Sequence, residues 1–275
     1  MSLFTVNVTT CTRCGTCVNE CPVGDIIELK PDSPVPSMKD GGADLCINCG
    51  HCVAVCPTGS FSLETMPVDA CPTVQRDKLP SGPSVTHLLR SRRSVRHYQD
   101  KTVDQSIIVD LINTVSYTPT GQNMQELSWL VLYSREEVRR LSETTIQWME
   151  YLHKEKHPAA VMFGVGRHIA AWRAGEDTIC RNAPHVVVAH ADKDVKIATI
   201  DGSAALTWFD IAAAASGLGT CWAGYVTACA AFWPPMREAL NLPGNNALIG
   251  AMMFGYPKYE YHRIPLRKKP DVIWR

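Results

Sequence analysis

The sequence predicts an α+β protein in which a small cysteine-rich domain precedes a larger domain of helices and strands. Eight of the twelve cysteines lie between residues 11 and 56, and from residue 85 onward apolar residues recur at helical and strand spacings. A chain of 275 residues is also long for one compact domain. We therefore expect a first domain at 1–66, a proline-rich linker at 67–84 and a second domain at 85–275.

The first domain contains one cysteine motif twice. Each copy has two residues between successive cysteines, three before the last cysteine, and a proline directly after it. Segments 11–22 and 46–57 match at seven of twelve positions, which indicates an internal duplication with pseudo-twofold symmetry. This spacing is typical of thiolate ligands to [4Fe-4S] clusters. The predicted ligands are Cys11, Cys14, Cys17 and Cys21 in the first motif, and Cys46, Cys49, Cys52 and Cys56 in the second.

With these motifs, residues 1–66 resemble a bacterial two-cluster ferredoxin of the four-iron type. The last cysteine of each motif in such proteins ligates the other cluster, which implies that Cys21 serves the second cluster and Cys56 the first. A structural zinc site or disulfides are the alternatives, but zinc signatures do not predict the prolines, and disulfides suit secreted chains. The other cysteines are expected to be small buried hydrophobes: Cys71, Cys180, Cys221 and Cys229.

Charge and hydropathy exclude several classes of function. The formal net charge is zero, with −4 in residues 1–66 and +4 in the remainder, which is too small and too dispersed for a nucleic-acid partner. The N-terminus lacks the pattern of a signal peptide. The longest apolar stretch, 204–226, is interrupted by Asp210 and three glycines, so we expect a buried helix and no membrane span. A cytoplasmic location follows as an expectation.

The second domain shows clear element signals. Apolar residues at helical spacing predict a helix within 104–117, and Ser134 with Glu137 forms a capping box that opens another. A central helix is expected at 200–216. Short apolar runs predict strands at 129–133, 185–190 and 248–254.

Three segments of this domain suggest cofactor chemistry. Segment 92–96 (Arg-Arg-Ser-Val-Arg) can bind a phosphate dianion, although an arginine run is also typical of a solvated face. Loop 119–125 is rich in amides that can read the edge of a flavin ring, or it is an ordinary turn. Segment 217–224 has glycines that allow close approach of a flat cofactor. No complete Gly-x-Gly-x-x-Gly follows a strand, which excludes a dinucleotide fingerprint.

In this order, and with the basic tail 267–269, the three segments resemble the FMN-dependent nitroreductase family over nearly all of 85–275. The resemblance implies an FMN-binding α/β sandwich and a homodimer with FMN at the interface. It implies that the FMN phosphate is held by Arg92, Arg93, Ser94, Arg96 and either Arg267 or Lys268. It places Ala223 and Gly224 beside the isoalloxazine, and Pro119, Thr120, Asn123 and Gln125 on a loop from the partner subunit. This loop departs from the family pattern Pro-Ser-x-x-Asn-x-Gln-Pro-Trp, with Thr120 for Ser and Glu-Leu-Ser before Trp129.

The resemblance implies an oxidoreductase, in an arrangement known in anaerobes. FMN exchanges electrons singly or in pairs, so we expect two [4Fe-4S] clusters to deliver electrons to FMN for reduction of a small acceptor, nitroaromatic or quinone-like. The donor is either ferredoxin or NAD(P)H. No catalytic side chain is identified, and His168 and Arg173 are the first polar residues to test in the expected pocket wall at 146–173. Most aromatics there are expected to pack in helices.

Two alternatives to this function remain open from the sequence. The chain could be an electron-transfer module whose oxidant is another protein, with small-molecule reduction as a side activity of an exposed flavin. It could also be a flavin-modifying or dehalogenating enzyme on the same fold, which would bind FMN without turning over nitroaromatics or quinones.

Overall fold

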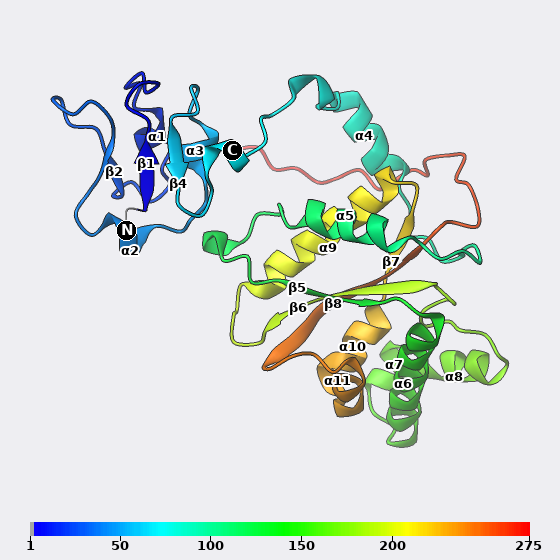
Figure 1. Ribbon diagram of the computed structural model, residues 1–275. Helices are drawn as coiled ribbons and strands as arrows, with labels where there is room; N and C mark the ends of the chain where they lie inside the picture. Colours follow the sequence, from blue (N-terminus) through cyan, green and yellow to red (C-terminus); the bar gives the residue numbers. More distant parts are fainter. Residues whose placement is uncertain (1–2) are drawn as a thin grey trace. The chain divides into compact units, whose positions relative to one another are not determined.

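The computed structural model describes residues 3–275 and divides the chain into two compact units (Figure 1). The first unit ends at Leu79 and also includes Gln122–Met124. The second comprises Pro80–Gly121 and Gln125–Arg275. The boundary falls inside the segment expected to be a linker. Within residues 3–275, no helix is both long and apolar enough to cross a membrane.

The first unit consists of short elements arranged as a repeat. Strand β1 pairs antiparallel with β4, and β2 pairs antiparallel with β3. A shift of 35 residues along the sequence places α1 on α3 and β2 on the last two residues of β4, in keeping with the expected internal duplication. The elements are β1 (Phe4–Val6), α1 (Thr16–Asn19), β2 (Ile27–Glu28), β3 (Ser37–Met38), α2 (Gly42–Leu45), α3 (His51–Ala54), β4 (Phe61–Leu63) and the 3-10 helices η1 (Val68–Ala70) and η2 (Arg76–Lys78).

A small apolar core holds these elements together. The rings of Phe4 and Phe61 lie 4.6 Å apart between centroids, on the paired strands β1 and β4. Ile26, Ile27 and Leu63 are buried around them. So small a core buries too little apolar area to be very stable alone, and structural metal commonly compensates in such domains.

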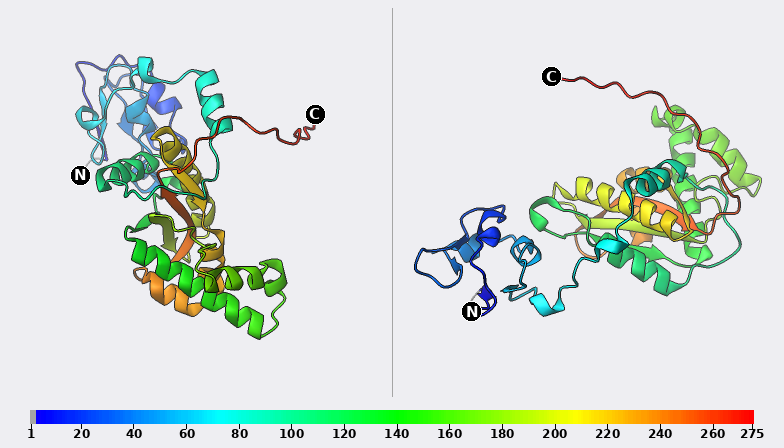
Figure 2. Two further views of the ribbon diagram at one scale, coloured as in Figure 1. Left: turned by 90° about the vertical axis from the view of Figure 1, so that its right-hand side faces the viewer. Right: turned by 90° about the horizontal axis from the view of Figure 1, so that it is seen from above.

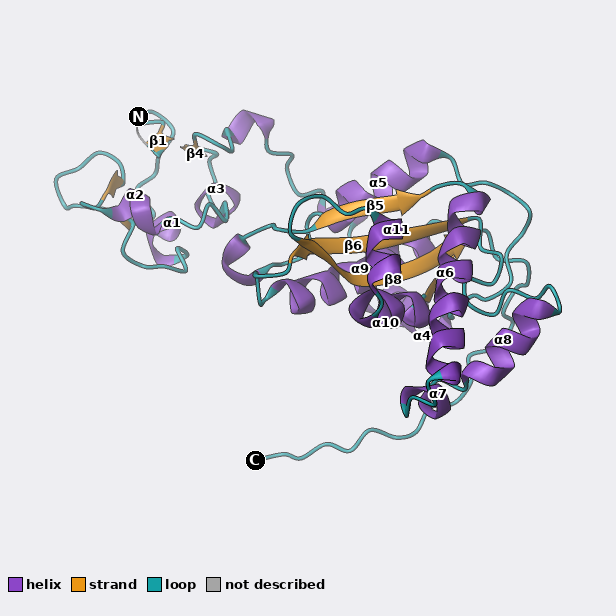
Figure 3. Cartoon of the chain, turned by 90° about the horizontal axis from the view of Figure 1, so that it is seen from below, coloured by secondary structure: helices purple, strands orange, loops and turns teal. Residues whose placement is uncertain are grey.

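The second unit contains one antiparallel sheet in the order β5-β6-β8-β7. The expected strands and the helices at 104–117 and 200–216 are confirmed within a few residues. Residues 258–275 form neither helix nor strand (Figure 3). The elements are α4 (Gly82–Ser91), α5 (Gln105–Val115), η3 (Gly121–Asn123), β5 (Ser128–Leu132), α6 (Arg135–Lys154), α7 (Ala159–Met162), α8 (Val165–Arg173), β6 (His185–Asp192), α9 (Ala198–Ala215), β7 (Gly219–Trp222), α10 (Gly224–Phe232), α11 (Pro234–Leu240) and β8 (Asn246–Gly255).

Helices cover both faces of this sheet (Figures 1 and 2). Helices α5 and α9 pack on one face, and α6, α10 and α11 lie on the other. Strand β6 is therefore apolar on both sides: Val187 faces the α9 layer and Val186 and Val188 face the α6 layer, because successive side chains alternate. This sandwich is the α/β arrangement that the sequence predicts.

Two local features of the second unit bear on the site. The capping box of α6 is confirmed, since Ser134 Oγ accepts from the Glu137 backbone N–H and Glu137 Oε2 accepts from the Ser134 N–H, each at 3.2 Å. Helix α9 is apolar nearly all round, but it carries two buried acids, Asp201 and Asp210. Buried carboxylates need hydrogen-bond or ion-pair partners. Asp210 pairs with Arg92 of segment 92–96, and Asp201 accepts a hydrogen bond from Gly121 of loop 119–125.

Candidate cofactor sites

The eight motif cysteines line two separate cavities in the first unit. Cys11, Cys14 and Cys17 line one of them together with Cys56. The other is lined by Cys46, Cys49 and Cys52 together with Cys21. The last cysteine of each motif therefore lies with the first three of the other, as in two-cluster ferredoxins.

Tight loops and hydrogen bonds shape these cavities. Arg13 and Asn48 occupy corresponding motif positions and both adopt left-handed backbone conformations, with φ of 55° and 52°. Thr16 Oγ1 donates to Cys14 Sγ at 3.1 Å, and this bond lowers the pKa of the exposed Cys14 thiol. The Ser60 backbone N–H donates to Cys56 Sγ at 3.2 Å. Such bonds to sulfur stabilise thiolate ligands and tune the potential of an attached cluster.

The arrangement suits a cluster better than a single ion. A structural zinc ion needs four ligands around one point. Among residues 3–275, no three His, Cys, Asp or Glu side chains are grouped closely enough to hold one metal ion. Four thiolates spaced around a cavity fit the separate corners of a cubane. Away from these cavities, Cys180, Cys221 and Cys229 are buried as expected, whereas Cys71 is partly exposed.

A cationic cavity in the second unit collects the predicted phosphate ligands. It has a volume of about 670 Å³ and is lined by Arg92, Arg93, Ser94, Arg96, Tyr261 and Arg267. Lys268 and Lys269 line an adjoining cavity that shares Arg92, Arg93 and Arg267. The structure thus brings the arginine segment and the basic tail together. It puts Arg267, and not Lys268, in the cavity that contains Ser94 and Arg96.

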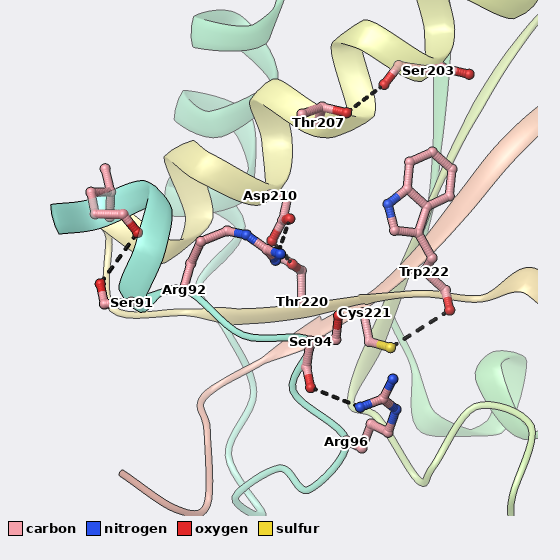
Figure 4. A network of polar contacts seen from close by, with 11 residues as sticks. Ser91, Arg92, Ser94, Arg96, Ser203, Thr207, Asp210, Thr220, Cys221 and Trp222 are labelled. Atoms are coloured by element: carbon pink, nitrogen blue, oxygen red, sulfur yellow. Dashed lines mark hydrogen bonds and ion pairs between the residues drawn. The ribbon is translucent and has the colours of Figure 1, made fainter. Parts of the chain in front are cut away.

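Buried Asp210 organises one side of this cavity (Figure 4). Arg92 Nη1 donates to Asp210 Oδ2 at 2.8 Å, and the Thr220 hydroxyl donates to Asp210 Oδ1. The Thr220 carbonyl accepts from the Val95 N–H at 2.8 Å, which ties the arginine segment to strand β7. One of the four guanidinium groups is therefore neutralised. The others form no ion pair among residues 3–275, and a bound phosphate dianion would relieve their mutual repulsion.

The glycine segment adjoins the same region. Gly217, Leu218, Gly219 and Thr220 share a cavity of about 760 Å³ with Arg92 and Arg93. A Cβ on Gly219 would collide with Val95, so this glycine permits the close approach of the arginine segment to β7. Gly224 begins α10 directly after buried Ala223, and a Cβ there would meet nothing within 4 Å. An open surface beside Gly224 fits a flat ring.

The amide loop is strained and internally bonded. Thr120 Oγ1 accepts from the Gln125 N–H at 3.1 Å. Gln122, Asn123 and Gln125 all have positive φ, between 49° and 55°, and such backbone strain is often found at functional sites. Pro119 is exposed. The amide of Asn123, which groups with the first unit, donates to the carbonyl oxygens of Ile47 and Asn48 at 3.1 and 2.8 Å.

The structure separates the two residues chosen for testing in segment 146–173. Arg173 lies at the surface and pairs with Glu150 at 2.8 Å. His168 is buried, and its Nδ1 and Nε2 lie 2.7 and 3.0 Å from the hydroxyls of Thr178 and Tyr225. Burial lowers the pKa of His168, and nearby arginines lower it further. Trp148 packs in the core, as expected for most of these aromatics.

Sequence reasoning missed several residues of the region. Asp210 lines the cavity of the glycine segment, and Tyr261 lines both that cavity and the cationic one. Tyr225 directly follows Gly224 and contacts His168. A usable signal existed only for Asp210, because an acid in a long apolar stretch must be paired or exposed. Tyr225 and Tyr261 have no comparable signal, since aromatic residues at such positions are ordinary.

Comparisons with known proteins agree with this geometry. Residues 89–256 match the sequence model of the Nitroreductase family, and residues 10–61 match that of the 4Fe-4S dicluster domain. A protein of Archaeoglobus fulgidus, provisionally named an NADH dehydrogenase/NAD(P)H nitroreductase, is 25% identical over 195 residues, which cover 68% of this chain and 95% of the relative.

Solved structures show the same fold for the second unit. A Bacteroides fragilis nitroreductase with bound FMN matches with a TM-score of 0.56 and 17% identity, over 70% of this chain and 98% of that one. A Desulfitobacterium hafniense nitroreductase with bound FMN matches with a TM-score of 0.55 and 15% identity, over 69% and 98%. The family match covers more than half of the chain. This protein is therefore an oxidoreductase that belongs to the nitroreductase family and carries an N-terminal 4Fe-4S dicluster domain.

Proposed function

We propose that the protein passes electrons from a donor through two [4Fe-4S] clusters to FMN and on to a small organic acceptor of the nitroaromatic or quinone type. The observation that carries the proposal is the pairing, in one chain, of two four-thiolate cavities with a cationic cavity suited to a phosphate. Two structural neighbours contain FMN, and the Archaeoglobus relative bears an NAD(P)H nitroreductase name, which supports the assignment.

Each cofactor has candidate ligands in this chain. Each cluster would be held by the first three cysteines of one motif and the last cysteine of the other. Arg92, Arg93, Ser94, Arg96 and Arg267 would hold the FMN phosphate, with Ala223 and Gly224 beside the ring. FMN accepts electrons singly or in pairs, and so can link one-electron clusters to a two-electron acceptor. The protein's part is to bind and orient these groups.

A homodimer is part of the proposal. Helix α9 leaves Ile200 and Trp208 66% and 43% exposed, and strand β7 leaves Trp222 42% exposed. Large exposed apolar side chains on rigid elements favour association with another protein surface. In a homodimer, loop 119–125 of one protomer would supply Pro119, Thr120, Asn123 and Gln125 to the FMN of the other. A cytoplasmic location and a ferredoxin or NAD(P)H donor complete the proposal.

Cofactor analysis tests the proposal. After anaerobic purification we expect about eight irons, about eight sulfides and one FMN per chain. Cys17→Ala should lower the iron content by about half, because it removes a ligand of one four-iron cluster. Cys180→Ala is the matched control, since Cys180 is also buried but lies in the second unit, and iron should be unchanged. Bound zinc in place of iron, or a protein without flavin, would contradict the proposal.

A further inference from the structure

A buried pair of acids lies beneath the amide loop. Both carboxylate oxygens of Glu126 are buried, and within residues 3–275 no group donates a hydrogen bond to them. The polar group that they meet is the carboxylate of Asp201, in the first turn of α9, whose side chain is 6% exposed. Two ionised carboxylates cannot bond to each other, so one of the two must carry a proton.

The surroundings decide which acid is neutral. Asp201 Oδ2 accepts the Gly121 backbone N–H at 2.9 Å, and the N-terminal turn of a helix stabilises a negative charge. Glu126 is not in a helix turn, and burial, which raises its pKa, outweighs the proximity of its own backbone N–H, which lowers it. The charge of Asp201 raises the pKa of Glu126 further. No Lys, Arg or His in the described part of the chain forms an ion pair with Glu126 that would oppose this.

The pair joins the two ends of a strained segment. Gly121 and Glu126 bracket residues 122–125, three of which have positive φ. A Cβ on Gly121 would lie 2.8 Å from Ile197 Cγ1, so this end of the loop is pressed against the residue that precedes α9. Glu126 occupies the position at which the family pattern has proline. Proline has no side-chain carboxyl group, so a chain that follows the pattern could not form this acid pair.

We propose that Glu126 is a positioning residue which, as a neutral acid, donates its proton to a hydrogen bond with Asp201 and thereby fastens loop 119–125 to helix α9. Asp201 fastens the other end through Gly121. The expected effect on FMN binding rests on the function proposed above. The protonation of Glu126 and the anchoring of the loop do not depend on that function. When Glu126 loses its proton the bond is lost, two like charges face each other, and the loop is released.

The sign of the pH dependence follows from this. An acid that is held neutral in the folded protein stabilises the fold fully below its unfolded pKa. That contribution is lost as the pH rises through the folded pKa. The loop should therefore be best ordered below the ordinary glutamic acid pKa of 4.5 and loosen as the pH rises through the raised pKa of Glu126.

Hydrogen exchange of the full-length protein tests the anchor without reference to FMN. Peptides covering 118–126 are followed at about pH 5 and about pH 8, on either side of the raised Glu126 titration, with correction for intrinsic exchange. The wild type should exchange at least about fivefold faster at the higher pH, the lower end of usual coupling energies. In Glu126→Gln the amide still donates to Asp201 but cannot titrate, so the corrected rate should not change. Glu143→Gln, on the exposed face of α6, is the matched control and should follow the wild type.

Infrared and FMN titrations complete the test. A protonated-carboxyl carbonyl band should persist in the wild type above pH 4.5, the ordinary glutamic acid pKa, and this component should be missing from Glu126→Gln. Over the same pH step the FMN dissociation constant of the wild type should rise about fivefold relative to that of Glu126→Gln, in which the phosphate titrates but residue 126 does not. A wild-type loop insensitive to pH, or the same acceleration in Glu126→Gln, would overturn the proposal. If no variant binds FMN, the proposed function fails, while the exchange experiment still decides the role of Glu126.

Discussion

Arg92 and Asp210 form an ion pair of 2.8 Å that joins the end of α4 to the middle of the apolar helix α9. The side chain of Asp210 is only 11% exposed and that of Arg92 26%. The pair therefore serves two purposes at once. It satisfies a buried carboxylate, and it holds one arginine of the cationic cavity in place.

Breaking this pair should destabilise the second unit. Asp210→Ala leaves a half-buried guanidinium and the Thr220 hydroxyl without their partner. We expect the free energy of unfolding to fall by about 2 kcal/mol, which is less than for a fully buried pair because Arg92 is partly solvated. Denaturant unfolding, followed with a signal from the second unit, measures this difference. Replacing both residues, as Arg92→Met with Asp210→Leu, should recover part of the loss, and an equal or greater loss in the double variant would contradict this account.

Arg267 should bind the FMN phosphate more strongly than Lys268 does. Only Arg267 shares the cavity of Ser94 and Arg96. Arg267→Ala should weaken FMN binding about tenfold, the loss of one charge-assisted hydrogen bond, and Lys268→Ala should have a smaller effect. Titration with riboflavin, which lacks the phosphate, is the control. Equal losses for FMN and riboflavin would show that Arg267 does not act on the phosphate.

The cavities also predict which cluster each cysteine variant loses. Cys56→Ala should remove the cluster of the first motif, and Cys21→Ala the cluster of the second. Iron content alone cannot separate the two variants, because each should fall by about half. Electron paramagnetic resonance with redox titration can separate them when a second substitution shifts the reduction potential of only one cluster.

A substitution at Thr16 should shift the potential of one cluster only. Thr16→Val keeps the shape of the side chain but removes the hydroxyl bond to Cys14 Sγ. Loss of about 1 kcal/mol of preferential stabilisation of the reduced state should lower the potential of the first-motif cluster by about 40 mV. The shift should persist in Cys21→Ala and be absent in Cys56→Ala. The opposite pattern would mean that each motif supplies all four ligands of its own cluster.

His168 should remain neutral at physiological pH. Its pKa is lowered by burial, and then by Arg167 and Arg181, so it should titrate below the usual 6.5. Stability that depends on the neutral ring is present above pH 6.5 and is lost as the pH falls toward the folded pKa. Histidine NMR titration measures the midpoint. Tyr225→Phe removes a hydroxyl partner of His168 Nε2 and should raise the midpoint of the His168 titration. An unchanged midpoint would show that this hydrogen bond does not favour the neutral ring.

The sequence predicts local features well and long-range pairings poorly. The cysteine spacing, the capping box of Ser134 and the short apolar run that forms β6 depend on neighbours in the chain, and each is present. Asp210 with Arg92 and Asp201 with Gly121 join residues far apart in sequence. Both pairings depend on the packing of α9 on the sheet, which no periodicity reveals. The choice of Arg267 over Lys268 likewise depends on the path of a tail without regular structure.

Anaerobic stopped-flow spectroscopy tests the central claim most directly. The protein is mixed with reduced ferredoxin, and the cluster and flavin absorbances are followed together. The relay predicts that the clusters bleach before the flavin, and that flavin reduction slows sharply in a variant that lacks both clusters, such as Cys17→Ala with Cys52→Ala. Flavin reduction at an unchanged rate in that variant would contradict the relay.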